Sequence, residues 1–600
     1  MVARRNDFDD RLARTRTFLR LRIQKLPPSF PEVALFFSVS DGSARARVVG
    51  ASGNSIEAAW QKGLAGLRSA MKASKLKGRW LRVDWVETVE ATTWRNLRVR
   101  LSKAKRNYFR YGIALDREFS FAFTETELNA NAMLYGGNSV AHAVINEKNF
   151  SLYARTKYPD LPHTLFGDDD EVFVFSTKGV FWDEEGELFE LNGVGRNAGR
   201  RHIEQLDADD VLALIRSSSE HLSRQVNEDG RFVYGYHPCF DREIDAYNAL
   251  RHASTTYSMI EAWEVTRDEV LKSAIERSLA YLCGLLVRHC RLPDGTKAAF
   301  LVDVGDEIKL GANAVSILAL TKYSAVTGAD IYLPVAEKLA NGIRFMQDQK
   351  DGSFTHVLSY PDLTVKERFR TIYYEGEAAF GLMRLFEIAK DPGLLASVEK
   401  AFEHFIASDH WKHHDHWLSY CVNELTRYRP DERYYRFGIR NFASYLDFVI
   451  ERITTFPTLL ELMMAAERMI TRIRQQPEYR HLLDEIDLDK FYRALNTRAH
   501  YLLNGHFWPE LAMYYRNPER IVGSFFIRHH AFRVRIDDVE HYLSGFVAYR
   551  NYLLRSLSDT DSGSKPVEIA PGSWATPAGE EMLGAHRDLE RAREASSCAN

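Results

Sequence analysis

Acidic, amide and imidazole side chains occur at helical spacing near residue 246. Asp241 and Asp245 are four residues apart, as are Asn248 and His252. On a helix these four side chains lie near one face. Arg251 lies beside them, and a charge inside an apolar helix is normally paired. The pattern is typical either of a catalytic carboxylate or of a structural ion pair between Asp245 and Arg251.

A second pair of carboxylates, Glu375 and Glu377, begins another apolar stretch directly after Tyr374. Glu375 suits the N-terminus of a helix, where the macrodipole favours anions. Glu377 lies deeper, among Ala, Phe, Gly and Leu. A glycosidase needs one carboxylic acid to protonate the leaving oxygen and one carboxylate to act as base or nucleophile. We therefore predict Glu377 as the acid and Asp241 or Asp245 as the base.

Histidines crowd a third segment, between Trp411 and Trp417. Neighbouring side chains on one segment converge poorly on a metal ion, and the segment has no His-Glu-x-x-His spacing, so we predict no metal. The two tryptophans favour stacking against a sugar ring, with His416 as a binding or proton-transfer residue. The alternative is that Trp417 belongs to the core.

Arginines lead into a fourth apolar stretch, which begins near residue 536. Arg533 and Arg535, together with Arg370, offer planar, bidentate donors for a carboxylate or phosphate. Asp537 and His541 share a helix face by their spacing. These residues favour an anionic sugar such as a uronate or a sugar phosphate. The alternative is that the arginines pair with the neighbouring acids.

The predicted site has a catalytic set and a substrate-binding set. The catalytic residues are Asp241, Asp245, His252, Glu377 and His416. The substrate-binding residues are Tyr236, His237, Asn248, Arg251, Arg370, Tyr374, Glu375, Trp417, Arg533, Arg535, Asp537 and His541. The chain has no P-loop, dinucleotide-binding or nucleophile-elbow motif in context. We therefore predict no cofactor and no serine-hydrolase chemistry.

The stretches that carry these residues belong to a repeat. An Asp-Gly pair followed by Phe recurs at Gly230, Gly295 and Gly352, with spacings of 65 and 57 residues. A period of this size indicates one repeated supersecondary unit, here a helical hairpin closed by a glycine turn. About 350 residues at roughly 60 per unit give about six hairpins, enough to close a ring.

Inner and outer helices of such a ring differ in composition. We expect six inner helices, rich in Ala, Ser, Gly and Leu, to begin near Ala246, Gly311, Glu375, Asp415, Pro457 and Ile536. The stretches 267–289, 333–347 and 392–407 carry more Lys, Glu and Arg, which favours an outer ring.

The segment 347–354, Gln-Asp-Gln-Lys-Asp-Gly-Ser-Phe, resembles the Gln-x-x-Asp-Gly-Ser-aromatic turn of α/α-toroid proteins. Over residues 205–557 the chain resembles the (α/α)6 toroids of the six-hairpin glycosidase-like and sugar-epimerase-like proteins. The resemblance implies inner helices around a central funnel, a mouth lined by the loops that lead into them, and a carbohydrate substrate.

Residues 28–200 have a different character, which predicts an α+β domain before the all-α (α/α)6 toroid. We expect a helix over 55–74 and strand character over 33–49, 80–89, 96–101, 108–123 and 172–191. Before this domain, residues 1–27 form a basic N-terminal arm. After the toroid, residues 558–600 have the polar composition of a mobile tail.

The composition of the chain argues against several classes of function. A net charge of −3 and a pI near 6.7 argue against nucleic-acid binding, and no window of 18 apolar residues predicts a transmembrane segment. The 5 cysteines form no Cys-x-x-Cys pair, which favours a reducing, cytoplasmic location. Partner proteins have two candidate attachment points, the basic arm and the tail.

The leading prediction is a carbohydrate-active enzyme that hydrolyses an oligosaccharide or anionic glycan precursor with a carboxylate pair, with epimerase or lyase chemistry as variants. Two alternatives remain open. One is a non-catalytic glycan- or peptide-binding or assembly protein of a polymer biosynthesis system. The other is a peptide-modifying or cyclase-type toroid.

Overall fold

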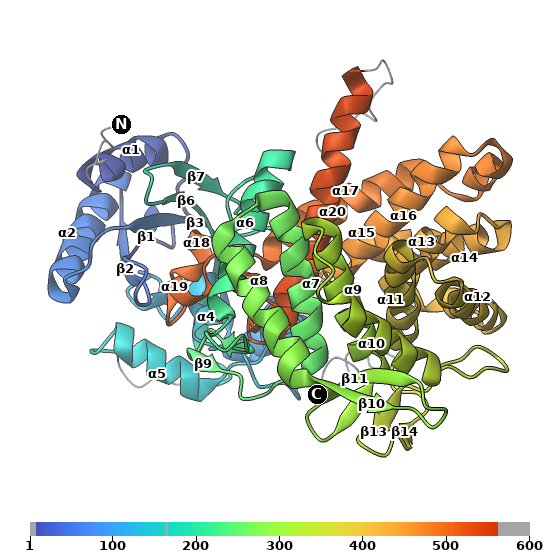
Figure 1. The fold of residues 1–600 in the computed structure, drawn as a ribbon. Helices are drawn as coiled ribbons and strands as arrows, with labels where there is room; N and C mark the ends of the chain where they lie inside the picture. The colour runs from blue at the N-terminus through green and yellow to red at the C-terminus, as the bar shows by residue number, and fades with distance from the viewer. Residues whose placement is uncertain (1–7, 162–165, 194, 562–600) are drawn as a thin grey trace.

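The structure, a computed structural model, describes residues 8–161, 166–193 and 195–561, and side chains up to residue 557 (Figure 1). The first 7 residues of the predicted basic arm and nearly all of the predicted tail lie outside these ranges. The rest of the arm contains helix α1 (Phe8–Arg20), which buries Leu12 and Leu19 against the sheet described below. None of the described helices is long and apolar enough to span a membrane.

The N-terminal half is built on an antiparallel sheet of seven strands within the described residues, in the order β2-β1-β3-β6-β4-β5, with β7 paired to β6. The strands are β1 (Val33–Ser40), β2 (Arg47–Gly53), β3 (Trp80–Thr93), β4 (Gly112–Ala114), β5 (Ala122–Phe123), β6 (Glu171–Trp182) and β7 (Leu188–Leu191). Strands β6 and β7 pair antiparallel as a hairpin within residues 172–191, where strand character is expected. Helix α2 (Ile56–Ser74) packs on β1 and β2 and starts at the Ser55 cap, as expected.

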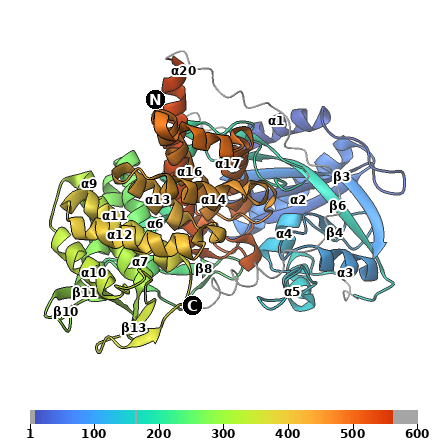
Figure 2. The ribbon, with the colours of Figure 1, turned by 90° about the vertical axis from the view of Figure 1, so that its right-hand side faces the viewer.

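One expected strand is wrong. Residues 96–101 lie in helix α3 (Trp94–Lys103) because Thr93 caps its N-terminus by accepting a hydrogen bond from the Asn96 backbone N–H. Trp94, Leu97 and Leu101 then fall on one buried face at helical spacing. Helices α4 (Glu125–Ala130) and α5 (Glu147–Lys157) complete this region, which Figure 2 shows beside the helical half.

The helical half is a closed ring, as predicted. The inner helices are α7 (Ala249–Thr266), α9 (Leu310–Thr327), α11 (Tyr373–Ala389), α13 (His416–Tyr428), α16 (Thr458–Gln475) and α20 (Ile536–Asp561). Each packs against the next, and α20 packs against α7, so the ring closes (Figures 1 and 2). The outer helices are α6 (Ala208–Gln225), α8 (Glu269–Tyr281), α10 (Leu333–Phe345), α12 (Pro392–Ala407), α14 (Glu432–Ala443) and α17 (Leu488–Leu502). Within the described residues this is an (α/α)6 toroid, and its inner helices begin within three residues of the predicted positions.

The three glycine turns are not equivalent. All three glycines have φ near +85°, the left-handed region that favours glycine. A Cβ on Gly230 would lie 2.1 Å from the carbonyl oxygen of Arg277, and one on Gly352 would lie 2.3 Å from that of Lys400. These two turns therefore pack on the next outer helix. Gly295 instead turns an open hairpin, and apart from its chain neighbours no atom of the described residues lies within 4 Å of its Cβ position.

Short strands precede several inner helices at one end of the ring. A five-stranded sheet consists of β10 (Val287–Arg291), β11 (Lys297–Asp303), β12 (Glu307–Lys309), β13 (Val357–Ser359) and β14 (Val365–Glu367). A three-stranded sheet consists of β8 (Gly235–His237), β9 (Arg242–Glu243) and β15 (Val534–Arg535). Because β12 leads into α9 and β15 into α20, these sheets mark the mouth of the ring.

The two halves share one interior. Residues 503–535, between α17 and α20, reach back to the N-terminal sheet. Arg82 of β3 donates to the Glu510 carbonyl oxygen at 2.9 Å, and the Tyr514 hydroxyl donates to Ser38 at 2.8 Å. Apolar side chains of this sheet also belong to the hydrophobic core of the ring. We propose that the boundary between the α+β domain and the toroid lies at residues 200–205.

Candidate active site at the centre of the helical ring

Glu377, in the second turn of α11, is buried at the centre of the ring. Its side chain needs the space beside Gly311 of α9, because a Cβ there would lie 1.8 Å from Glu377 Oε2. The residue is 4% exposed, and Oε2 has no hydrogen-bond partner among the described residues. Burial, with the nearby Asp415 and Glu540 carboxylates, raises the pKa of Glu377 to about 8. Glu377 therefore holds a proton at neutral pH.

Glu540, on α20, faces the centre from the opposite side of the ring. It is 2% exposed, and the Ser254 hydroxyl on α7 donates to its Oε2 at 2.6 Å. Burial raises the pKa of Glu540 to about 7, although the neighbouring His541 acts in the other direction. A carboxyl group poised near neutral pH is suited to both giving and taking a proton.

Two histidines share a third carboxylate. His541 Nδ1 lies 2.9 Å from Glu461 Oε2 on α16, and His416 Nε2 on α13 lies 3.9 Å from the same oxygen. The two imidazole rings are 5.5 Å apart between centroids. Burial lowers the pKa of His541, but Glu540 and Glu461 outweigh it and raise the value to about 10. His541 is therefore an imidazolium at neutral pH.

We call Glu377, His416, Glu461, Glu540 and His541 the central cluster. It draws side chains from four inner helices, and Ser254 of α7 and Gly311 of α9 complete the ring around it. The His541 side chain is 24% exposed, whereas the others are nearly inaccessible. Solvent therefore reaches the cluster on the side of His541.

The central cluster can transfer protons. A buried carboxylic acid, a carboxyl group near its pKa and an imidazolium provide proton donors and an acceptor in one enclosed place. The ligand atoms of His416, Glu461 and His541 also lie within 4.8 Å of one another, as around a metal ion. Without a metal His541 is an imidazolium, which has no lone pair to offer, so a metal ion here would have to displace that proton.

The predicted base is not in the central cluster. The helix assumed for residues 241–248 does not form, because Asp241 has φ +52° in a turn and Asn248 is the N-cap of α7. Asp241 instead pairs with Arg520 at 3.0 Å. Asp245 is exposed in the loop before α7. Neither carboxylate faces Glu377 in the way that the predicted helix required.

His252 lies between α7 and the outer helix α8. Its Nδ1 is 2.7 Å from the Tyr247 hydroxyl, and its Nε2 is 3.0 Å from the Ser278 carbonyl oxygen. Burial lowers the pKa of His252 to about 4, so the ring is neutral. This histidine is a satisfied core residue on the outer side of α7.

The arginines predicted to bind an anion pair with acids, which is the alternative that the sequence left open. Arg370 binds Glu307 at 2.7 Å and also Glu367, while Arg533 binds Asp538 at 3.1 Å. These charges are therefore compensated within the chain.

Asp537 links the remaining two arginines. It lies 2.9 Å from Arg251 and 3.0 Å from Arg535, so it takes the place of Asp245 as the partner of Arg251. The predicted structural ion pair exists, but with a different acid.

The other predicted binding residues have mainly structural surroundings. Tyr236 lies under the Arg520 guanidinium, with 4.9 Å to the ring centroid, and burial lowers the pKa of the half-buried His237. Tyr374 is buried beside Gly311, and Trp417 is buried in the core, 6.2 Å from the Phe380 ring. Glu375 faces away from the ring centre, toward His410 and His356.

Sequence reasoning missed Glu461 and Glu540. Glu461 is a lone carboxylate in the apolar run that starts α16, which is the same signal that singled out Glu377. Glu540 directly precedes His541 and follows Asp537 and Asp538, so nothing in its sequence surroundings sets it apart. Treating every lone acid inside an inner helix alike would have found Glu461 but not Glu540.

Comparison with known protein families and with curated protein sequences gives no match. Among solved structures, the chain is similar to a cellobiose 2-epimerase from Bacillus thermoamylovorans, with 12% identity over 57% of this chain and 100% of that chain, at a TM-score of 0.43. It is similar to an alpha-1,6-mannanase from Salegentibacter, with 11% identity over 57% and 100%, at 0.41. It is also similar to an unsaturated glucuronyl hydrolase specific for heparin, with 11% identity over 57% and 98%, at 0.40. The helix contacts within this chain themselves close the ring into a toroid.

Proposed function

We propose that the central cluster is the active site of an enzyme that processes a sugar by acid–base catalysis, most simply by hydrolysing a glycosidic bond. One observation carries this proposal. Glu377 and Glu540 are buried on opposite sides of a closed ring, and within the described residues neither is paired with a lysine or arginine. Carboxyl groups buried for structural reasons alone are normally compensated by such a partner.

The roles follow from the surroundings of each group. Glu377 holds a proton at neutral pH and donates it to the glycosidic oxygen as the bond to the sugar carbon breaks. Glu540 accepts a proton from the attacking water. The His541 imidazolium lies 3.7 Å from Glu540 and favours its anionic form, while Ser254 orients it.

A second candidate reaction is epimerisation or isomerisation of a sugar. It is favoured by the two imidazoles of His416 and His541, which lie 5.5 Å apart and share Glu461. Such a reaction moves a proton to or from a carbon next to a carbonyl group, and imidazoles and carboxylates commonly perform this transfer. In this reaction Glu377 would hydrogen-bond the carbonyl oxygen.

Support for a sugar substrate comes only from the toroids that the hairpin repeat resembles. Support for proton transfer comes from the residues of the central cluster. The predicted preference for an anionic sugar loses its support, because Arg370, Arg533 and Arg535 are already paired. The central cluster has three carboxyl groups around one imidazolium, which favours a neutral sugar.

The test is a panel of neutral and uronate mono- and disaccharides incubated with the protein in D2O. New reducing ends without carbon-bound deuterium indicate hydrolysis, whereas carbon-bound deuterium without bond cleavage indicates epimerisation or isomerisation. If the folded protein turns over no member of the panel, and binds sugars equally well with and without Glu377→Gln, the non-catalytic binding protein replaces both candidates.

A further inference from the structure

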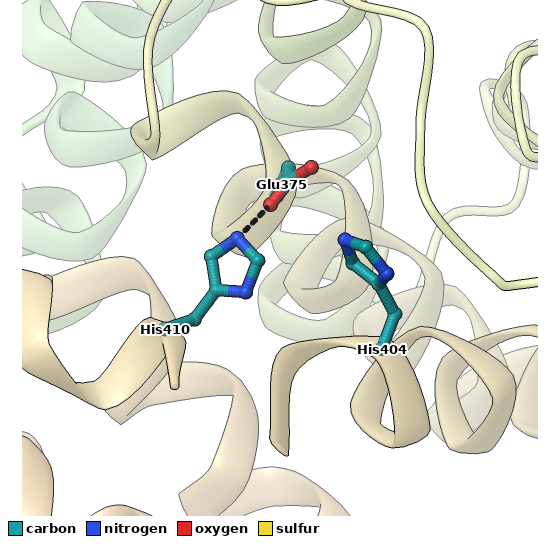
Figure 3. A group of neighbouring side chains, drawn as sticks. All are labelled: Glu375, His404 and His410. Atoms are coloured by element: carbon teal, nitrogen blue, oxygen red, sulfur yellow. Dashed lines mark ion pairs between the residues drawn. The ribbon is translucent and has the colours of Figure 1, made fainter. Parts of the chain in front are cut away.

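Three potential metal ligands converge outside the ring centre. Glu375 lies in the first turn of α11, His404 in the last turn of α12, and His410 in the short 3-10 helix His410–His413. Their ligand atoms all lie within 4.8 Å of one another. Figure 3 shows the two imidazoles beside the Glu375 carboxylate, each from a different segment. Glu375 and His410 are buried, and His404 is half-buried.

The closest contact in this group is an ion pair between an imidazole and a carboxylate. His410 Nε2 lies 2.8 Å from Glu375 Oε2, the pair joined by the dashed line in Figure 3. Nevertheless, Oε2 of Glu375 and Nδ1 of His410 are buried without a hydrogen-bond partner among the described residues. Leaving buried polar atoms unpaired is unfavourable. Two ligand atoms that are this close and buried are suited to sharing a cation.

His356 positions the carboxylate. Its Nδ1 accepts the backbone N–H of Arg370 at 3.0 Å, so in the neutral ring the proton is on Nε2. That Nε2 faces Glu375 Oε1 at 3.5 Å. His356 therefore faces Oε1 of the carboxylate, on the side away from Oε2, which faces His410. It acts as a positioning residue and not as a ligand.

We propose that Glu375, His404 and His410 bind a divalent transition metal ion, with Zn²⁺ as the best match. Two imidazoles and one carboxylate form a typical zinc ligand set. Tetrahedral ligands at about 2.1 Å from zinc lie about 3.4 Å apart, which small side-chain rotations reach from the present separations. The half-buried His404 gives access for the ion and for a water molecule as fourth ligand.

The site has a structural consequence for the ring. Glu375 and Glu377 are two residues apart on α11 and face different ways, toward the outer hairpin and toward the ring centre. A metal ion at Glu375 would fasten the first turn of α11 to α12 and to residues 410–413. This proposal does not depend on the reaction performed at the central cluster.

The experiment is Zn²⁺ titration of the full chain after removal of metals by a chelator, followed by calorimetry and by elemental analysis after dialysis. The wild type should bind Zn²⁺ and gain thermal stability from it. The double variant His404→Ala, His410→Ala should lose one equivalent, and His356→Gln should weaken binding about 10–100-fold. His289→Ala, at an exposed histidine of β10, is the matched control and should bind as the wild type does.

Either of two results would overturn the proposal. The first is a folded wild type that binds no Zn²⁺ at micromolar concentration. The second is a double variant that keeps the full stoichiometry and the full thermal gain of the wild type. If the double variant fails to fold, His404→Gln alone decides, because His404 is half-buried at a helix end, and unchanged Zn²⁺ affinity would refute the site.

Discussion

A carboxylic acid that is buried without a cation partner is expensive to keep, and Glu377 is such a residue. The chain makes room for it with Gly311 on the neighbouring helix. A buried carboxyl group that lowers stability is thus accommodated by a glycine. Such destabilising features occur where function requires them.

Glu377→Gln should lower kcat by about 10²–10⁴-fold, because glutamine keeps the shape of the side chain but cannot donate the proton. The melting temperature should stay the same or rise, because no ion pair is lost. Steady-state kinetics and thermal unfolding measure both effects. Glu269→Gln, at an exposed position of α8, is the control. A variant that loses stability but keeps kcat would show that Glu377 is structural.

Gly311→Ala should destabilise the chain by about 1–3 kcal/mol, since the new methyl group would overlap Glu377 Oε2 and lie 2.6 Å from Tyr374 Cδ1. Urea unfolding of the single variants and of the double variant with Glu377→Ala checks the origin of the effect. The shorter side chain in the double variant should recover part of the lost stability. Additive losses would mean that the methyl group clashes elsewhere.

The pH dependence of stability follows from the same groups. The pKa of Glu377 is raised from 4.5 to about 8 in the folded chain, so its proton is held more tightly there than in the unfolded chain. Its contribution to stability is present below pH 4.5 and is lost as the pH rises through 8. Glu377→Gln should therefore gain about 2–5 kcal/mol over the wild type between pH 5 and 8, as measured by urea unfolding. A constant difference across this range would show that Glu377 is not buried as described.

At the scale of single elements, the repeat of the glycine turn is informative but uneven. The turns at Gly230 and Gly352 press against the backbone of the next outer helix, whereas the turn at Gly295 is open. The Asp-Gly turn therefore contacts an outer helix at two positions and forms the tip of a hairpin at the third.

Gly352→Ala and Gly295→Ala form a matched pair, because both glycines have φ near +85°. The backbone strain is common to both, but only the first adds a methyl group 2.3 Å from the Lys400 carbonyl oxygen. Gly352→Ala should therefore cost about 1–3 kcal/mol more in the free energy of unfolding, measured by urea titration. Equal losses would contradict the contact with α12.

Much of the ring could be predicted from the sequence, since hydrophobic periodicity and glycine turns act locally. The first turn of each inner helix was placed to within three residues. The strand expected over residues 96–101 is wrong, because β-branched Val99 favours a strand whereas the Thr93 cap starts a short amphipathic helix there. The sequence predicts some residues of the central cluster but not the partners of the charged residues around it. Polar residues in apolar helices identify Glu377 and His541, but partners such as Asp537 for Arg251 depend on ring closure.

At the scale of the whole molecule, the sheet and the ring are joined by charged and apolar contacts. Arg82 forms a buried ion pair with Asp84 on β3. It also donates a hydrogen bond to the carbonyl oxygen of Glu510, in the segment between α17 and α20. The shared hydrophobic core runs through the same junction. We therefore expect both halves to unfold together.

Arg82→Ala should lower the free energy of unfolding by about 3–5 kcal/mol, because it leaves the Asp84 carboxylate buried and unpaired. Arg68→Ala, which breaks an exposed pair with Asp9, should change it by less than about 1 kcal/mol. Calorimetry and far-ultraviolet circular dichroism should give one coincident transition in each case. Two separate transitions would show that the halves are independent.

Helix α20 closes the ring on α7, although about 270 residues lie between the two helices in the chain. During synthesis on the ribosome, five inner helices and the whole N-terminal sheet emerge before α20 does. Until then, the inner face of α7 has no neighbour on one side, and Glu540 and His541 are absent. The central cluster is therefore completed at a single late moment, and a nascent chain stalled before residue 536 would expose apolar surface that chaperones recognise.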